Sequence, residues 1–364
     1  MRAIAFAPLL SLLVVACEQP PAKPAPAAAP AAAAAPAAAA ASAAAAAGPK
    51  TNAEGRIAWT RPEDADIPAG PLGDSIKRGL DLFTHTSERL PDYTPSSLNC
   101  SSCHLDAGRK PFAAPVVGSY ARFPKYMGRT DAVITIQERV NHCMTRSMAG
   151  VRLPPDSAEM VDMVNYIAWL STGIPVGAHI EGEDLPTLPR LEGDVANGQR
   201  LFGEKCVACH QADGAGIPGA FPALWGPRSY SIGASMSRHE RAASFIKLFM
   251  PQTAPGTLSD QEAYDLAAFI NSHPRPDSPG KELDFPDGKA PYDVPFATAG
   301  HEAYRPPAEL LPRPYPEDSQ VFRPTQAAGS GRLAAGGAAG DAAGGGKAGK
   351  GGKAGKAGKA GGPR

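Results

Sequence analysis

The stretches Cys100-Ser101-Ser102-Cys103-His104 and Cys206-Val207-Ala208-Cys209-His210 decide the fold of this 364-residue chain. In each stretch, two cysteines separated by two residues precede a histidine, which is the pattern of c-type haem attachment. The thiols can form thioethers to the haem vinyl groups, and the histidine supplies one axial ligand to the iron. The sequence therefore predicts two covalently attached haem c groups, held by Cys100, Cys103, His104, Cys206, Cys209 and His210.

The segments around the two motifs form an internal repeat. Gly79-Leu80-Asp81-Leu82-Phe83 precedes the first motif, and Gly198-Gln199-Arg200-Leu201-Phe202 precedes the second. We expect both on helices, where the glycine permits another helix to approach and the Leu-Phe pair gives an apolar face. A loop and a closing helix follow each motif. This arrangement predicts an all-α fold with two cytochrome c-type domains, over residues 57–178 and 194–275.

Capping signals mark the start of both closing helices. Ser259-Asp260-Gln261-Glu262 is a capping box, and Asp156-Ser157-Ala158-Glu159 is a close variant. The first unit is longer than the second because residues 84–98 have no counterpart there, so we expect an insertion at this place.

The other segments are predicted to be irregular. Residues 179–193 form an acidic, Pro-containing linker, and residues 276–328 form a Pro-rich extension that we expect to lie across the domains as a strap. Residues 329–364 form a Gly/Ala/Lys tail that we expect to be disordered, like the N-terminal segment. The cationic tail could contact anionic lipid or polysaccharide, or have no dedicated partner. Formal net charge is zero, and we expect no nucleic-acid partner.

The N-terminus predicts export. Residues 1–16 have a basic start and a short apolar core, as in a signal peptide. The core ends at Cys17 in a segment that resembles a bacterial lipobox, so we expect Cys17 to be lipidated; a chance cysteine after an ordinary signal is the alternative. Residues 17–56 are an Ala/Pro-rich tether with too few bulky apolar side chains for a core. We therefore expect a lipoprotein anchored to a membrane on the periplasmic side.

The distal iron ligand of the second haem is predicted to be Met250. It lies 40 residues after His210, directly before Pro251 and the closing helix, where cytochromes c place their axial methionine. Met236 is the competing ligand, and a role for Met250 in the core is a further alternative. Together, His210 and Met250 would then coordinate the iron of the second domain.

The corresponding place in the first unit holds Cys143, 39 residues after His104. His142, Met144 and Met148 are alternative ligands, and a free buried cysteine is another possibility. An unpaired thiol is a liability in an oxidising compartment unless it is used. As a ligand, Cys143 would be a thiolate opposite His104, favoured by nearby arginines, and it would lower the haem potential relative to methionine.

Basic residues are concentrated in the same unit. Residues 100–155 contain eight Lys or Arg side chains and three Asp or Glu side chains. No other segment of the folded part is so one-sided in charge.

Several of these residues resemble one family. Asn99 to Gly108, with the following Pro111-Phe112-Ala113-Ala114-Pro115, resembles the first haem segment of the dihaem c-type thiosulfate dehydrogenases. Arg139-Val140-Asn141-His142-Cys143, with Arg146-Ser147-Met148 after it, resembles their haem-ligand cysteine motif. The resemblance covers residues 72–296. Phe249 departs from members that have a lysine before the axial methionine, and Lys247 lies on another face of its helix.

The resemblance implies a function and a set of site residues. Its first haem, ligated by histidine and cysteine, is the active site, where two thiosulfate ions are joined to tetrathionate, in a reaction that can be reversible. The catalytic residues carried over are Cys143, Arg139, Ser147 and Arg129. The second haem relays electrons to a c-type cytochrome or other periplasmic acceptor. The leading alternative is a non-catalytic dihaem electron-transfer cytochrome c, and a Sox-system haem subunit is a third possibility.

Overall fold

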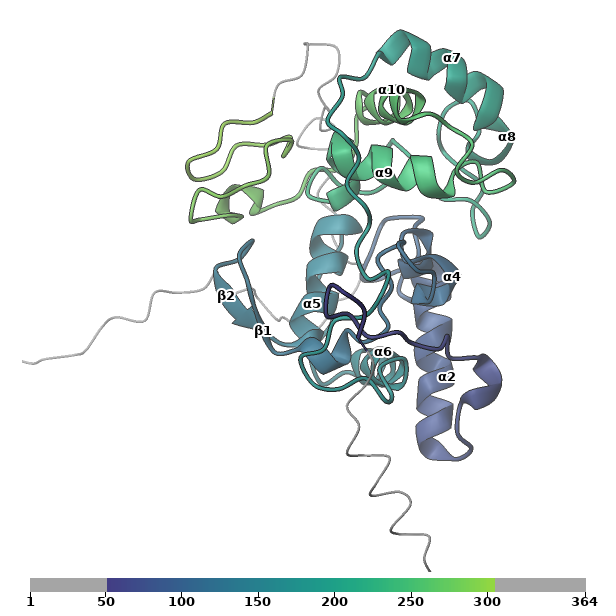
Figure 1. The fold of residues 1–364 in the computed structure, drawn as a ribbon, viewed down its shortest axis with the longest axis vertical. Coiled ribbons are helices and arrows are strands. Elements are labelled where there is room, and N and C mark those ends of the chain that lie inside the picture. Colours follow the sequence, from purple (N-terminus) through teal and green to yellow (C-terminus); the bar gives the residue numbers. More distant parts are fainter. Residues whose placement is uncertain (1–50, 305–364) are drawn as a thin grey trace, which may run out of the picture. The chain divides into compact units, whose positions relative to one another are not determined.

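The computed structural model describes residues 51–304, and helices dominate this part of the chain (Figure 1). The first domain contains α2 (Pro71–Thr84), α3 (Thr86–Arg89), α4 (Leu105–Gly108), α5 (Ile136–His142) and α6 (Ala158–Trp169). The second contains α7 (Val195–Lys205), α8 (Val207–His210), α9 (His239–Phe249) and α10 (Asp260–Asn271). Short 3-10 turns occupy Asp64–Asp66, Cys100–Ser102, Tyr120–Arg122, Ser235–Ser237 and Lys281–Leu283. The expected signal peptide, Cys17, most of the tether and the Lys-rich tail lie outside the described residues.

The predicted repeat is present as two pairs of packed helices, α2 with α6 and α7 with α10. A Cβ atom at Gly79 would collide with the backbone carbonyl of Asp162, and one at Gly198 would collide with that of Asp265. Both glycines therefore permit a close helix crossing, as the sequence predicts.

Each of these crossings is also held by a buried carboxylate that the sequence analysis did not identify. Asp162 accepts hydrogen bonds from Ser75 at 2.6 Å and from Arg78 at 2.7 Å. Asp265 accepts from the backbone of Asp194 at 2.8 Å and from Asn197 at 2.6 Å. The two domains therefore repeat a packing geometry as well as a sequence pattern.

The closing helices begin at side-chain caps. At α10, the Ser259 hydroxyl accepts from the Glu262 backbone and the Glu262 carboxylate accepts from the Ser259 backbone, which forms the predicted capping box. At α6, the cap is Ser157, whose hydroxyl accepts from the backbone of Met160 at 3.2 Å. The closing helix of the first domain thus starts one residue later than a cap at Asp156 would indicate.

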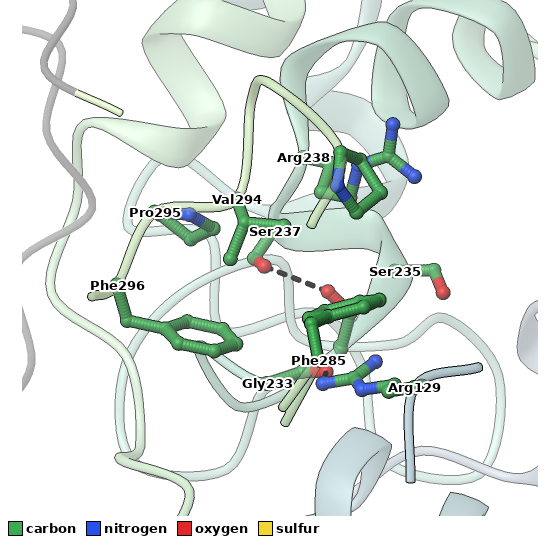
Figure 2. Close-up of a pocket in the computed structure, with 11 residues that line it drawn as sticks. Arg129, Gly233, Ser235, Ser237, Arg238, Phe285, Val294, Pro295 and Phe296 are labelled. Carbon is green, nitrogen blue, oxygen red and sulfur yellow. Dashed lines mark hydrogen bonds between the residues drawn. The ribbon is translucent and has the colours of Figure 1, made fainter. Parts of the chain in front are cut away.

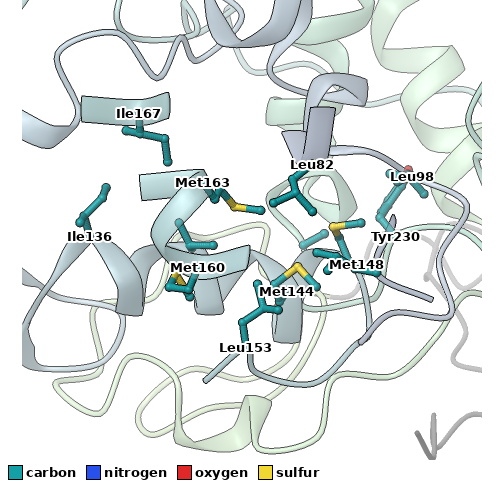
Figure 3. Packing of buried hydrophobic residues seen from close by; sticks show 13 residues of the cluster. Leu82, Leu98, Ile136, Met144, Met148, Leu153, Met160, Met163, Ile167 and Tyr230 are labelled. Carbon is teal, nitrogen blue, oxygen red and sulfur yellow. The ribbon is translucent and has the colours of Figure 1, made fainter. Parts of the chain in front are cut away.

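The core of the first domain is rich in methionine (Figure 3). Met160, Met163 and Ile167 line one face of α6, and all three are buried, as their helical spacing predicts. The second domain has its own core, in which Ala263, Leu266, Phe269 and Ile270 of α10 are buried. Tyr230, which belongs to the second half of the chain, packs into the core of the first domain.

Two features add to the predicted helical frame. Strands β1 (Lys125–Met127) and β2 (Ala132–Ile134) form an antiparallel hairpin, with Lys125 opposite Ile134. Three-residue strands are too short to show an alternating pattern, so the sequence did not reveal this hairpin. The Pro-rich segment is irregular from residue 276 to residue 304, except for one 3-10 turn. Within residues 51–304, every helix is too short or too polar to cross a bilayer.

Candidate functional site

The first attachment motif presents its histidine with one ring nitrogen already engaged. Nδ1 of His104 lies 2.6 Å from the carbonyl oxygen of Ala114, so this nitrogen carries the proton and Nε2 is left as the ligand atom. Cys100 and Cys103 are free thiols, and burial raises the pKa of each to about 12. Two unpaired thiols beside an oriented imidazole match the chemistry of thioether attachment and axial ligation.

The second motif has the same arrangement. Nδ1 of His210 lies 3.0 Å from the carbonyl oxygen of Pro222, which again leaves Nε2 as the ligand atom. Cys206 and Cys209 are also free thiols. Burial lowers the pKa of His210, and a neutral imidazole is the form that binds a metal.

A buried arginine also fits a haem. Arg275 is completely buried; it donates to the backbone carbonyl of Ile270 at 2.8 Å and lies 4.2 Å from the ring centre of Tyr230. Its Nε has no hydrogen-bond partner, and it pairs with no carboxylate among residues 51–304. Tyr230 packs in the same cluster as Cys103. A buried cation without a counter-charge is unfavourable, and haem brings two propionate carboxylates.

Cys143 lies directly at the end of α5, where the helix continues as a π-helical turn over Cys143–Ser147. Such turns are rare and occur often at functional sites. Arg139 is one turn earlier on the same face, and its Nη1 donates to Cys143 Sγ at 3.1 Å. Burial opposes ionisation of this thiol, but the positive charge of Arg139 and the proximity of His104 outweigh that effect and lower the pKa of Cys143 to about 6. The structure therefore brings Cys143, Arg139 and His104 together.

The three competing ligands of the first haem are occupied elsewhere. Met144 and Met148 are buried in the hydrophobic core of the first domain (Figure 3). His142 is buried too, and its Nε2 lies 3.2 Å from the carboxylate of Glu138. Cys143, the fourth residue that the sequence left open, lies close enough to His104 for the two side chains to interact.

Arg129 and Arg146 meet at a carboxylate that sequence reasoning missed. Asp284, from the Pro-rich segment, is 1% exposed and lies between the two guanidinium groups. Arg129 also donates to the backbone carbonyl of Gly233 at 2.8 Å. Burial lowers the pKa of Arg129, and repulsion by Arg146 and Arg139 adds to this against the attraction of Asp284. All three arginines are therefore within electrostatic range of one another.

Most of the basic excess in the first unit is neutralised by acids from other segments. Ion pairs join Arg109 to Asp64, Arg122 to Glu183, Arg152 to Glu138, and Arg129 and Arg146 to Asp284. Arg139 is different, because within residues 51–304 it pairs with no carboxylate and instead contacts Cys143. The positive charge available at the site is thus concentrated near Cys143, and the count of basic residues overstates it.

Ser147 lies at the end of the π-helical turn. Its carbonyl oxygen accepts a hydrogen bond from the backbone of Ser231 at 3.1 Å, and the Ser231 hydroxyl donates to the carbonyl of Arg146. The Ser147 hydroxyl makes no hydrogen bond within residues 51–304. The turn is therefore fixed by the second half of the chain, and its serine hydroxyl is available to a ligand.

Arg129 also lines a separate pocket (Figure 2). Arg129 and Phe285 lie next to each other at one end, with the guanidinium carbon 5.5 Å from the ring centre, and Arg238 lies at the other end. The lining also includes Gly233, Ala234, Ser235, Ser237, Pro291, Val294, Pro295 and Phe296. Neither Cys143 nor Arg139 lines this pocket.

The two methionines considered as ligands of the second haem have apolar surroundings. Met250 follows the last residue of α9 and packs against the second-domain core and against a cluster that contains Phe245 and Phe249. Met236 packs against these groups and also against the core of the first domain. Lys247 is turned away, because its amine donates to the carbonyl of Leu258 and lies 3.4 Å from Asp260.

Two known domain families match parts of the chain. A SoxA/TsdA cytochrome c domain matches residues 92–176, and a cytochrome c domain matches residues 195–274. Each range contains one attachment motif. The protein therefore carries two covalently bound haem c groups.

Known relatives match both domains together. The chain is 44% identical over 230 residues to thiosulfate dehydrogenase of Allochromatium vinosum, over 60% of this chain and 85% of that protein. It is 40% identical to thiosulfate dehydrogenase of Psychrobacter arcticus, over 68% of this chain and 77% of that protein. A solved structure of thiosulfate dehydrogenase (TsdBA) from Marichromatium purpuratum matches with a TM-score of 0.58 and 36% identity, over 63% of this chain and 51% of that one. The chain thus belongs to the thiosulfate dehydrogenase family, as an oxidoreductase with two cytochrome c domains.

Proposed function

We propose that this enzyme joins two thiosulfate ions to tetrathionate at Cys143 and passes the electrons through the second domain to an external acceptor. The observation that carries the proposal is that the half-buried Cys143 thiol accepts a hydrogen bond from Arg139 and lies close to His104. The proximity of the two side chains supports Cys143 as the second protein ligand of the first haem. For the second haem we propose Met250, because it lies 40 residues after His210 and has apolar surroundings.

The reaction can be written so that atoms and electrons balance. Two thiosulfate dianions give one tetrathionate dianion and two electrons, and the haem held at each motif would supply an acceptor for one electron. The Cys143 sulfur forms a bond to the outer sulfur of the first thiosulfate as the two electrons leave. The outer sulfur of the second thiosulfate then attacks that same sulfur, so the bond to Cys143 breaks and the thiolate is restored. The sequence of steps can also run in reverse.

The neighbouring side chains support this chemistry by charge. Arg139 stabilises the Cys143 thiolate and offers positive charge to the sulfonate groups of the dianion. Arg129 and Arg146 extend this positive region, and the Ser147 hydroxyl donates a hydrogen bond to substrate. Two like-charged substrates then approach each other in a site whose fixed charge opposes their repulsion.

The proposal includes the location of the enzyme. Residues 1–16 would direct export across the inner membrane, and lipidation of Cys17 would anchor the protein to a membrane on the periplasmic side. The electron acceptor would then be a c-type cytochrome or another periplasmic carrier. Cells treated with globomycin should accumulate the precursor, and a mature protein without lipid would contradict the anchor.

Product analysis on the purified two-haem protein tests the activity. Wild-type enzyme supplied with an oxidant should consume two thiosulfate ions for each tetrathionate formed and transfer two electrons. Cys143→Ala should keep both haems attached through their cysteine pairs, lose the thiolate signature in the low-temperature spin-resonance spectrum, and form no tetrathionate. Normal turnover by this variant would contradict the catalytic role of Cys143, whereas absence of tetrathionate formation by the wild-type protein would favour an electron carrier.

A further inference from the structure

The Pro-rich segment after the second domain supplies a carboxylate to the first domain. Oδ2 of Asp284 accepts from Nε and Nη2 of Arg129 at 2.8 and 2.6 Å. Oδ1 accepts from Nε and Nη2 of Arg146 at 3.0 and 2.7 Å. Each guanidinium therefore presents the same edge to a different oxygen of one buried carboxylate, in the two-point geometry that fixes orientation as well as distance.

The contact leaves the opposite side of both guanidinium groups available. Nη1 of Arg129 and Nη1 of Arg146 make no hydrogen bond within residues 51–304. Arg139 and Arg146 both lie close enough to Arg129 to repel its charge. Without a carboxylate between them, two such cations would move apart by rotation of their long side chains.

The backbone holds the carboxylate in place. The Phe285 backbone nitrogen donates to the carbonyl of Arg129 at 2.8 Å, and the Phe285 ring lies against the Arg129 guanidinium (Figure 2). The Arg129 guanidinium in turn donates to Gly233. Asp284 is therefore attached to the hairpin turn through both main chain and side chain, which makes it rigid relative to the arginines.

We propose that Asp284 is a positioning residue for thiosulfate: it holds Arg129 and Arg146 so that their free Nη1 groups face the sulfonate groups of the substrate at Cys143. This inference rests on the proposed function. In it, the extension after the second domain completes the active site of the first. Asp284 itself does not touch the reacting sulfur atoms.

The matched pair Asp284→Asn and Asp293→Asn tests this role. Asp284→Asn would keep the shape of the side chain, but the amide oxygen can serve only one arginine, and the amide NH₂ group would face the N–H groups of the other. Asp293 is an equally buried carboxylate of the same segment, and it binds Arg238 at 2.6 Å and the Glu240 backbone at 3.0 Å. Asp293→Asn therefore weakens the attachment of the segment and leaves Arg129 and Arg146 paired.

We expect Asp284→Asn to raise the KM for thiosulfate about tenfold or more, because loss of a hydrogen bond to a charged group typically weakens binding by at least about that factor. The turnover number at saturation and the spin-resonance signature of the first haem should change little. Asp293→Asn should lower thermal stability about as much as Asp284→Asn does, and it should leave the KM for thiosulfate unchanged. Asp284→Glu, which keeps the charge, should restore part of the affinity, and it replaces the asparagine variant if that one does not fold.

Three results would overturn the inference. The KM could stay the same in Asp284→Asn, or it could change equally in both asparagine variants, which would indicate simple loss of attachment. The KM could also fall, which would mean that Asp284 only offsets positive charge. If wild-type protein forms no tetrathionate, the proposed function fails instead, and the two failures are thereby distinguished.

Discussion

The two domains present their haem-binding histidines in the same way and differ on the opposite side. In both, a glycine permits a close helix crossing, a buried aspartate holds the crossing, and a backbone carbonyl orients the histidine ring. About forty residues after that histidine, the first domain has a thiol in a π-helical turn beside Arg139. At the corresponding position, the second domain has Met250 among apolar side chains.

This comparison separates the features that attach a haem from the features proposed to make it catalytic. The shared frame accounts for attachment in both domains, and it contains nothing specific to sulfur chemistry. The opposite side controls the electron density at the iron and the charge that a substrate meets. Substitutions that make one domain resemble the other therefore test which side chains make the first domain catalytic.

The largest effect is expected from making the first domain resemble the second. Cys143→Met should keep a low-spin haem with a higher midpoint potential, because a thioether donates less charge than a thiolate. Tetrathionate formation should fall at least about 10³-fold, as expected when a nucleophile is removed. Redox titration and a tetrathionate assay measure both quantities. A variant with wild-type turnover would mean that Cys143 is only a ligand.

A smaller loss is expected when the thiol stays and its cationic neighbour is removed. Arg139→Gln should cost about 2–4 kcal/mol of transition-state stabilisation, comparable to the loss of one oxyanion donor. Both haems should remain attached, so a fall in kcat/KM can be attributed to the lost charge. Lys110→Gln is the matched control, because Lys110 is an exposed basic residue of the same segment. Equal losses in both variants would mean that overall charge matters and position does not.

The second domain should respond to its own ligand change with a relay defect. Met250→Leu should leave its haem high-spin or with a substitute ligand, and should slow electron transfer to the acceptor. Reduction of the first haem by thiosulfate should be less affected, since Cys143 is untouched. Stopped-flow spectra at the two haems separate these steps. If the spectrum and the rate of electron transfer are both unchanged, Met236 or Lys247 becomes the better candidate for the ligand of the second haem.

The smallest effects concern the shared frame. Gly79→Ala and Gly198→Ala should each destabilise the protein by about 1–3 kcal/mol, because the added methyl group collides with a backbone carbonyl. Gly203→Ala, also on α7, has no atom within 4 Å of the added group and should be neutral or stabilising. Denaturant unfolding of the two-haem protein measures all three. Equal values at positions 198 and 203 would contradict the close crossing.

Features that are local in sequence were predictable. The attachment motifs, the repeated glycines and the cap at Ser259 depend on residues a few positions apart, so spacing alone indicates them. The roles of Cys143 and Met250 as ligands stay predictions, which rest on their similar distances after the two histidines. The sequence left Met144 and Met148 open as ligands, since a buried methionine and an axial methionine have the same composition.

Features that depend on distant partners were not predictable. Asp284 is separated from Arg129 by 155 positions and comes from a segment without periodicity, so nothing near it in sequence indicates its role. The ion pair between Arg122 and Glu183 joins positions 61 apart, and it explains why a count of basic residues misjudged the available charge. The β1–β2 hairpin was missed because its strands are only three residues long.

The position of Asp284 has a consequence for the way the enzyme is made. In the proposed scheme the chain is exported from its N-terminus, so both attachment motifs emerge before residue 284. Haem could then be attached to the first domain while Arg129 and Arg146 still lack their carboxylate partner. A chain that ends at residue 275 would contain both motifs, Cys143 and Met250, so any haem that it acquires would give it the colour of a cytochrome. In the scheme proposed above, that cytochrome would be a poor enzyme, so absorbance alone would not distinguish finished enzyme from unfinished.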